Sequence, residues 1–134
     1  MTIEHISPDG LFQLDGFSQV VTASAGKLAF IAGQGAFDPD LKLVGEGDLH
    51  AQTLQAFSNL RVALAAVGAG PEDVVSSNMY VVGMDADAVD TFTRAMNEAL
   101  DGKPFPPNAS TMLGVQSLAL GGMLVEISAI ARIP

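Results

Sequence analysis

Apolar and polar residues alternate most clearly near the end of the chain, over positions 123–131. One face of the strand predicted there carries Val125, Ile127, Ala129 and Ala131, and the other carries Leu124, Glu126, Ser128, Ile130 and Arg132. Glu126 is therefore a carboxylate among apolar neighbours. Loss of water at such a position raises the pKa of a carboxyl group, so that it can exchange a proton near neutral pH. The alternative is a structural Glu that pairs with a cation such as Arg132.

The remaining pattern predicts an α+β domain. Further strands are predicted over 17–23, 28–32, 41–44, 74–82 and 106–119, with a hairpin-like turn at 24–27, a glycine-containing turn before 123, and an irregular segment over 1–16. Apolar residues at helical spacing predict one helix that follows Asp48 as its N-cap, and a second that starts near Asp85. Because two helices cover only one face of a mixed sheet, the other face is expected to be buried by self-association.

Length and composition narrow the class of protein. The 134 residues fit one domain spanning 1–134, and the chain contains no cysteine, hence no disulfide, thiolate ligand or Cys nucleophile. No apolar run reaches the roughly 18 residues that span a bilayer, which favours a soluble, cytoplasmic protein without a membrane partner. The formal net charge of -9 opposes nucleic-acid binding.

Metal and cofactor sites are not indicated. His5 and His50 stand alone, without partners at ligand spacing. The Gly33-Gln34-Gly35 segment lacks the third glycine and the following helix of a dinucleotide-binding motif. We therefore expect no metal and no cofactor, and the expected partner is a small-molecule metabolite.

Several short motifs, in order, resemble the Rid/YjgF family, whose members are also labelled L-PSP or reactive-intermediate deaminase proteins. They are Gly33-Gln34, Asp38-Pro39, the helical Gln52, Gln55, Asn59 and Leu60, Gly68-Ala69-Gly70, Pro107, Ser110-Thr111, Gly114-Val115, Leu118-Ala119, Val125-Glu126-Ile127 and Ala129-Ile130-Ala131. The resemblance implies a chorismate-mutase-like fold, with two helices on one face of a mixed six-stranded sheet. It also implies a homotrimer with sites between subunits.

The resemblance further implies which residues form the site. Glu126 matches the Glu that helps to position the attacking water in family members that deaminate imines, and Thr111 matches the Cys or Thr near it. The positions of the substrate-binding residues are matched by Phe17, Gly33, Gln34, Asn108, Ala109 and Ser110. The chain departs from the family where Ala109 replaces the arginine that clamps a substrate carboxylate. Phe17 also lacks the hydroxyl of the usual tyrosine, and Thr93 or a neighbour stands where an asparagine is usual.

Two functions remain open from the sequence. One is hydrolysis of a small imine or enamine other than the typical 2-aminoacrylate, with Glu126, Thr111 and the backbone of Gly33-Gln34 as the working groups. The other is a non-catalytic, trimeric protein that binds or senses a small molecule. A third function, RNA cleavage or translational inhibition, is disfavoured by the acidic charge.

Overall fold

The computed structural model describes residues 2–14, 18–24 and 26–134. These residues form two helices of several turns, α1 (Leu49–Ala65) and α2 (Ala86–Ala99), and one short 3-10 helix, η1 (Pro71–Asp73). The strands are β1 (Ile3–Ile6), β2 (Val20–Ala23), β3 (Leu28–Gln34), β4 (Val74–Val82), β5 (Ala109–Val115) and β6 (Val125–Arg132). The predicted α+β class is confirmed.

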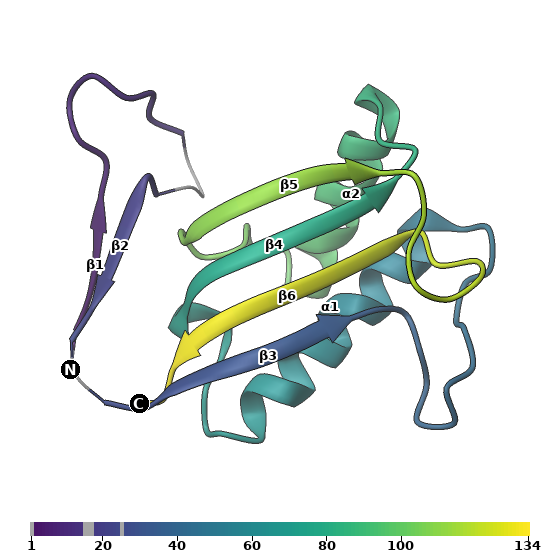
Figure 1. Cartoon of the computed structure of the whole chain (residues 1–134), viewed down its shortest axis with the longest axis horizontal. Coiled ribbons are helices and arrows are strands. Elements are labelled where there is room, and N and C mark those ends of the chain that lie inside the picture. The colour runs from purple at the N-terminus through teal and green to yellow at the C-terminus, as the bar shows by residue number, and fades with distance from the viewer. Residues whose placement is uncertain (1, 15–17, 25) are drawn as a thin grey trace.

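Four of the six strands form a mixed sheet in the order β3-β6-β4-β5, in which β4 and β5 run parallel and the other pairs antiparallel. Both helices lie on the same face of this sheet, as predicted (Figure 1). The other two strands, β1 and β2, pair as an antiparallel hairpin beside one end of the sheet. The opposite face of the four-stranded sheet, called the open face below, has no helix over it.

Several strand pairings differ from the sequence-based prediction. Strand β1 lies within the segment predicted as irregular, whereas Leu43 of the predicted strand 41–44 forms only an isolated bridge with Phe37. Strand β2 pairs with β1 and not with β3, and β4 separates β5 from β6. Alternation assigns the face on which a side chain lies but carries no information about which strands are neighbours. This explains why the pairing of β2 and the separation of β5 from β6 were not predicted.

The two helices begin at the predicted caps. The carboxylate of Asp48 accepts a hydrogen bond of 3.0 Å from the backbone N–H of Ala51, and that of Asp85 accepts one of 2.7 Å from Ala88. Each satisfies a backbone donor that the first turn of a helix leaves unpaired, and each places negative charge at the positive end of the helix dipole. The prediction that Asp48 caps the first helix is thus confirmed, and the second helix starts next to Asp85, as predicted.

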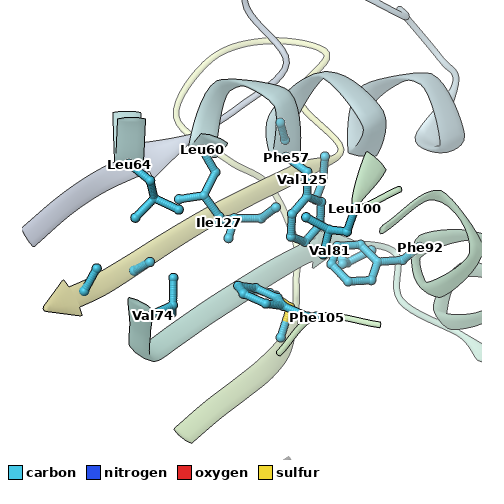
Figure 2. Packing of buried hydrophobic residues seen from close by; sticks show 14 residues of the cluster. Phe57, Leu60, Leu64, Val74, Val81, Phe92, Leu100, Phe105, Val125 and Ile127 are labelled. Atoms are coloured by element: carbon cyan, nitrogen blue, oxygen red, sulfur yellow. The ribbon is translucent and has the colours of Figure 1, made fainter. Parts of the chain in front are cut away.

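The hydrophobic core lies between α1, α2 and the helix-facing side of β4 and β6 (Figure 2). Phe57 of α1 is central: its ring lies 5.8 Å from that of Phe92 and 5.7 Å, edge to face, from that of Phe105. Such offset and edge-on contacts are favourable beyond the area that they bury. Strand β6 contributes Val125, Ile127, Ala129 and Ala131, all buried. The face predicted to be apolar is therefore the one that faces the helices.

A buried amide ties α1 to the connection that precedes β6. Gln52 is fully buried, and its side-chain NH₂ donates to the carbonyl oxygens of Gly45 (3.1 Å) and Gly122 (3.0 Å). Its carbonyl oxygen accepts a hydrogen bond of 2.8 Å from the backbone N–H of Leu124. Three backbone groups from two separate connections thus have one side chain as their partner, and β6 starts from a fixed point.

We expect Gln52→Leu to lower the free energy of unfolding by about 2–5 kcal/mol, because it leaves buried backbone groups without partners. Denaturant unfolding at one fixed protein concentration measures this. Gln55→Leu is the control on the same helix, since Gln55 is only part-buried and donates one hydrogen bond, to Asn59. An equal loss for both variants would show that the buried amide has no special role.

Candidate functional site

Glu126 lies on the open face of the sheet, away from the helices. It alternates along β6 with the buried Val125 and Ile127, and it is itself half-buried. Directly across the ladder on β4 stands Tyr80, whose strand neighbours Met79 and Val81 are buried on the helix side. The strand register thus places a carboxylate and a phenol side by side on the same face.

Strand β3 approaches Glu126 through a bulge. The register with β6 passes from Ile31↔Ala129 to Gln34↔Ile127, so one extra residue is accommodated in β3. Within this bulge lies Gly33, where an added Cβ atom would overlap the carboxylate of Glu126. Gly33 is therefore needed because the side chain of Glu126 packs against it.

The connection that follows β3 is held by Asn59 of α1. The side-chain NH₂ of Asn59 donates to the carbonyl oxygens of Gly35 (3.0 Å) and Phe37 (2.9 Å), and its own carbonyl oxygen accepts from Gln55 (2.9 Å). Gln34 and Asn59 both line an open hollow of about 270 Å³. The side-chain amide of Gln34 itself donates to the carbonyl oxygen of Ala32, at 3.0 Å. Gln34 thus lies next to the bulge with its amide turned back on its own strand.

Thr111 shares the open face but is distant from Glu126 within one chain. It is exposed on β5, opposite Asn78 of β4, whereas Glu126 is on β6. Two strand spacings separate β5 from β6, about 10 Å. Ala109, two residues before Thr111, lies on the same face at the start of β5. The predicted site residues on the open face therefore fall into two groups, one at β3 and β6 and the other at the β5 edge.

Two of the predicted substrate-binding residues lie on the helix side of the sheet instead. Asn108 is buried, accepts a hydrogen bond of 2.7 Å from the hydroxyl of Ser77, and donates one of 3.0 Å to the carbonyl oxygen of Pro106. Ser110 pairs in register with the buried Ser77 and so points to the same side. In this arrangement the Asn108 side chain fixes the entry into β5.

Two further residues from the sequence analysis remain. Phe17 lies outside the described residues. Thr93 is exposed on α2, where its hydroxyl donates a hydrogen bond of 2.8 Å to the carbonyl oxygen of Val89. This back-bond within the helix occupies the hydroxyl hydrogen.

The open face also carries Asn78 and Tyr80 of β4, which the sequence analysis did not assign to the site. Ser128, Asn78 and Thr111 form a row across β6, β4 and β5, next to the row of Glu126, Tyr80 and Leu113. A hollow of about 150 Å³ lies beside the first row, lined by Phe30, Ile31, Ser76, Asn78, Ser128, Ala129 and Ile130. The signal for Tyr80 and Asn78 was present, because both alternate with residues of β4 that face the core. It required knowing that β4 lies next to β6.

Among the described residues, no group of three or more His, Cys, Asp or Glu side chains is placed to hold a metal ion. In the same part of the chain, no helix is long and apolar enough to cross a membrane.

Comparison with known proteins agrees with the motifs and the fold. The sequence model of the Endoribonuclease L-PSP family matches residues 11–133. The chain belongs to this family, the Rid/YjgF/L-PSP family. Protein DfrA of Myxococcus xanthus is 34% identical over 117 residues, which are 86% of this chain and 83% of that protein. The RutC family protein PH0854 of Pyrococcus horikoshii is 32% identical over 116 residues, with 86% and 85% covered.

A solved structure confirms the fold of this Rid-family chain. YyfB from Yersinia pestis, described as a protein of unknown function of the conserved Rid family, superposes with a TM-score of 0.87 at 36% identity. The match covers 98% of this chain and 99% of YyfB. Two helices on one face of a mixed sheet are thus the family arrangement, and the prediction of family and fold is confirmed.

We expect Gly33→Ala to lower the free energy of unfolding by about 1–2 kcal/mol, because the new methyl group displaces the Glu126 side chain. In a Glu126→Ala background the same change should cost less by at least about 0.5 kcal/mol, since the space is then empty. Denaturant unfolding of the four proteins in this cycle measures the coupling.

Gly121→Ala is the matched control, because nothing lies within 4 Å of a Cβ atom there. Additive costs of Gly33→Ala and Glu126→Ala would show that the two residues are not in contact.

Proposed function

We propose that this protein is a subunit of a homotrimer that hydrolyses a small imine or enamine metabolite in a cleft between subunits. The observation that carries the proposal is the position of Glu126: half-buried on the open face and packed against the bulge of β3. Membership of the Rid/YjgF/L-PSP family gives the reaction class its prior support.

Hydrolysis of a protonated imine needs one water and a group that moves both of its protons. Water adds to the imine carbon while Glu126 takes one proton from it, and a neutral carbinolamine results. Glu126 returns that proton to the nitrogen. The C–N bond then breaks as the hydroxyl proton passes to Glu126 and on to the departing ammonia, so that a carbonyl compound and ammonium leave. The backbone N–H groups at Gly33-Gln34 and the hydroxyl of Thr111 are the candidates for stabilising the oxygen of the intermediate.

The distribution of the predicted residues supports a site shared between subunits. Glu126 and Gly33 lie toward the β3 edge of the sheet, and Ala109 and Thr111 lie on β5 at the opposite edge. In a ring, the β3 edge of one subunit faces the β5 edge of the next, and such head-to-tail contacts close with cyclic symmetry. Each cleft then contains both groups of residues.

The open face is also suited to a subunit contact. Phe30 is 75% exposed there and Leu113 is 42% exposed. Phe30 lies opposite Ile130 of β6, and Leu113 lies opposite Tyr80 of β4. Apolar side chains therefore extend over several strands. Burial of this surface against a second and third copy removes it from water, which stabilises the assembly.

A non-catalytic binding protein is the second candidate. The observation that favours it is Ala109 on the open face, where deaminating relatives are expected to carry an arginine. The same trimer and the same cleft would then hold a small molecule without converting it. Imine hydrolysis that is lost on removal of the Glu126 carboxylate would separate the hydrolase from this candidate.

We expect Glu126→Gln to lower turnover by about 10²–10⁴-fold, because the amide keeps the shape of the side chain but cannot accept the proton. The measurement is the acceleration of ammonia release from freshly generated imines above spontaneous hydrolysis. Glu98→Gln, on the exposed surface of α2, is the control and should keep full activity. An unchanged rate in Glu126→Gln would end the catalytic assignment.

A mixing experiment tests whether the site is shared. Ala109→Trp should block the β5 side of the cleft, and Glu126→Gln should disable the β6 side, so that each variant alone is inactive. After co-refolding at equal amounts, random trimers should regain about one quarter of the wild-type activity, because one cleft in four combines two intact sides.

Light scattering checks in parallel that wild type and both variants are trimers. A monomeric wild type, or a mixture as inactive as its components, would contradict the shared cleft.

A further inference from the structure

Charged residues are almost absent from the four-stranded sheet. Strands β3, β4 and β5 contain none, and β6 contains two, Glu126 near its start and Arg132 at its end. At the rise of an extended strand, six residues place them about 20 Å apart. Arg132 also faces Asp73, with 3.4 Å between its Nη2 and the carboxylate Oδ1. Among the described residues of the four strands, the open face around Glu126 therefore carries one formal charge, which is negative.

The other five Lys and Arg residues of the chain lie outside the sheet. Arg61 donates to the carbonyl oxygen of Ala99 and pairs with Asp101 at 3.2 Å, and Arg94 pairs with Asp90 at 3.0 Å, both on the helices. The remaining three, Lys27, Lys42 and Lys103, are exposed in connections between elements.

The β5 side of the cleft also lacks charge. The segment 104–125, which contains the last part of the connection into β5, β5 itself and the whole connection to β6, has no Asp, Glu, Lys or Arg. A neighbouring subunit that brings this segment to Glu126 adds no counter-charge from it. An anionic group on a ligand would thus meet a carboxylate in a partly desolvated cleft, where like charges repel strongly.

Tyr80 adds a second feature that favours a cation. It is the one tyrosine of the chain and stands directly opposite Glu126 on the neighbouring strand. Side chains at such positions have Cβ atoms about 4.5–5.5 Å apart. An aromatic face beside a carboxylate attracts a cation through both the ring quadrupole and the negative charge.

We propose that Glu126 and Tyr80 form a binding site for a protonated imine that carries no carboxylate of its own, with an apolar substituent. The inference rests on the proposed function for the reaction and on the charge distribution of the sheet for the substrate class. The iminium group lies against the Glu126 carboxylate and the Tyr80 ring, and the substituent lies over uncharged side chains such as Leu113.

The reaction balances for such a substrate. An iminium ion, R–CH=NH₂⁺, and one water give an aldehyde, R–CHO, and ammonium, NH₄⁺. The C–O bond forms as one water proton passes to Glu126, which then delivers it to the nitrogen. The C–N bond breaks as the remaining hydroxyl proton passes to the Glu126 carboxylate and from there to the departing ammonia, which leaves as ammonium. No oxidant, reductant or cofactor takes part.

A matched pair of imines tests the proposal. 3-Methylbutan-1-imine, generated from the amine by an amine oxidase, and 2-imino-4-methylpentanoate, generated from leucine by an amino-acid oxidase, differ only in the carboxylate. We expect kcat/KM, divided by the rate of spontaneous hydrolysis of the same imine, to be about tenfold or more higher for the first, equivalent to a difference of at least 1.4 kcal/mol in transition-state binding. Equal or reversed values would overturn the substrate class and leave the proposed hydrolysis standing.

Binding of unreactive ligands separates this inference from the catalytic one. In calorimetry, 3-methylbutylammonium should bind and 4-methylpentanoate should not, and Glu126→Gln should remove the preference. Preferential binding of the ammonium without any imine hydrolysis would refute the proposed function but not the cation site. Preferential binding of the carboxylate would refute the cation site.

Two variants of Tyr80 test the aromatic part. Tyr80→Phe keeps the ring and should keep most of the affinity for 3-methylbutylammonium. Tyr80→Leu removes the ring and should weaken binding by about 3- to 30-fold, the range of a cation–π contact. Equal affinity of the leucine variant and wild type, with both proteins trimeric by light scattering, would exclude Tyr80 from the site.

Discussion

The structure depends on the alternation of β6, which lies between β3 and β4 in the sheet and has the helices on one of its faces. Its buried positions carry Val125, Ile127 and the small Ala129 and Ala131, on which α1 packs. Its other positions carry Glu126, Ser128 and Ile130. A shift of one residue in register would bury the carboxylate and expose the core residues. The hydrophobic core thus fixes the face on which the only acid of the sheet is presented.

Two side-chain amides, the buried Gln52 and the half-buried Asn59, extend this constraint to the connections around the site. Gln52 binds the segment that enters β6, and Asn59 binds the segment that leaves β3. Both lie on α1, seven residues apart, and therefore on the same side of the helix. The helix that fills the core also sets where Gly33 and Glu126 meet, so that the geometry of the site is inherited from core packing.

The faces of the strands and the starts of the helices could be predicted from the sequence, whereas the order of the strands could not. Period-two alternation placed Glu126 on the open face, and caps placed the starts of both helices, because these signals depend on residues close in sequence. Strand order was not visible, so β5 was expected next to β6, and Tyr80 on the intervening β4 was missed. The inward turn of Asn108 was missed as well, because its partner Ser77 is distant in sequence. The alternation of residues along a strand determined on which face each side chain lies. Which strands are neighbours depends on tertiary pairing, which the sequence pattern does not contain.

The scarcity of charge on the sheet determines how strongly the Glu126 carboxylate interacts with a charged ligand. In open solvent, water screens a single carboxylate, and its interaction with a ligand charge is weak. If a second subunit covers the open face, the uncharged 104–125 segment excludes water without neutralising the carboxylate. The same charge then acts over a lower effective dielectric, which strengthens both the attraction for an iminium ion and the repulsion of an anion. In the proposed trimer, assembly and substrate choice would thereby be coupled, since the surface proposed to close the ring is also the surface that would set the electrostatics of the cleft.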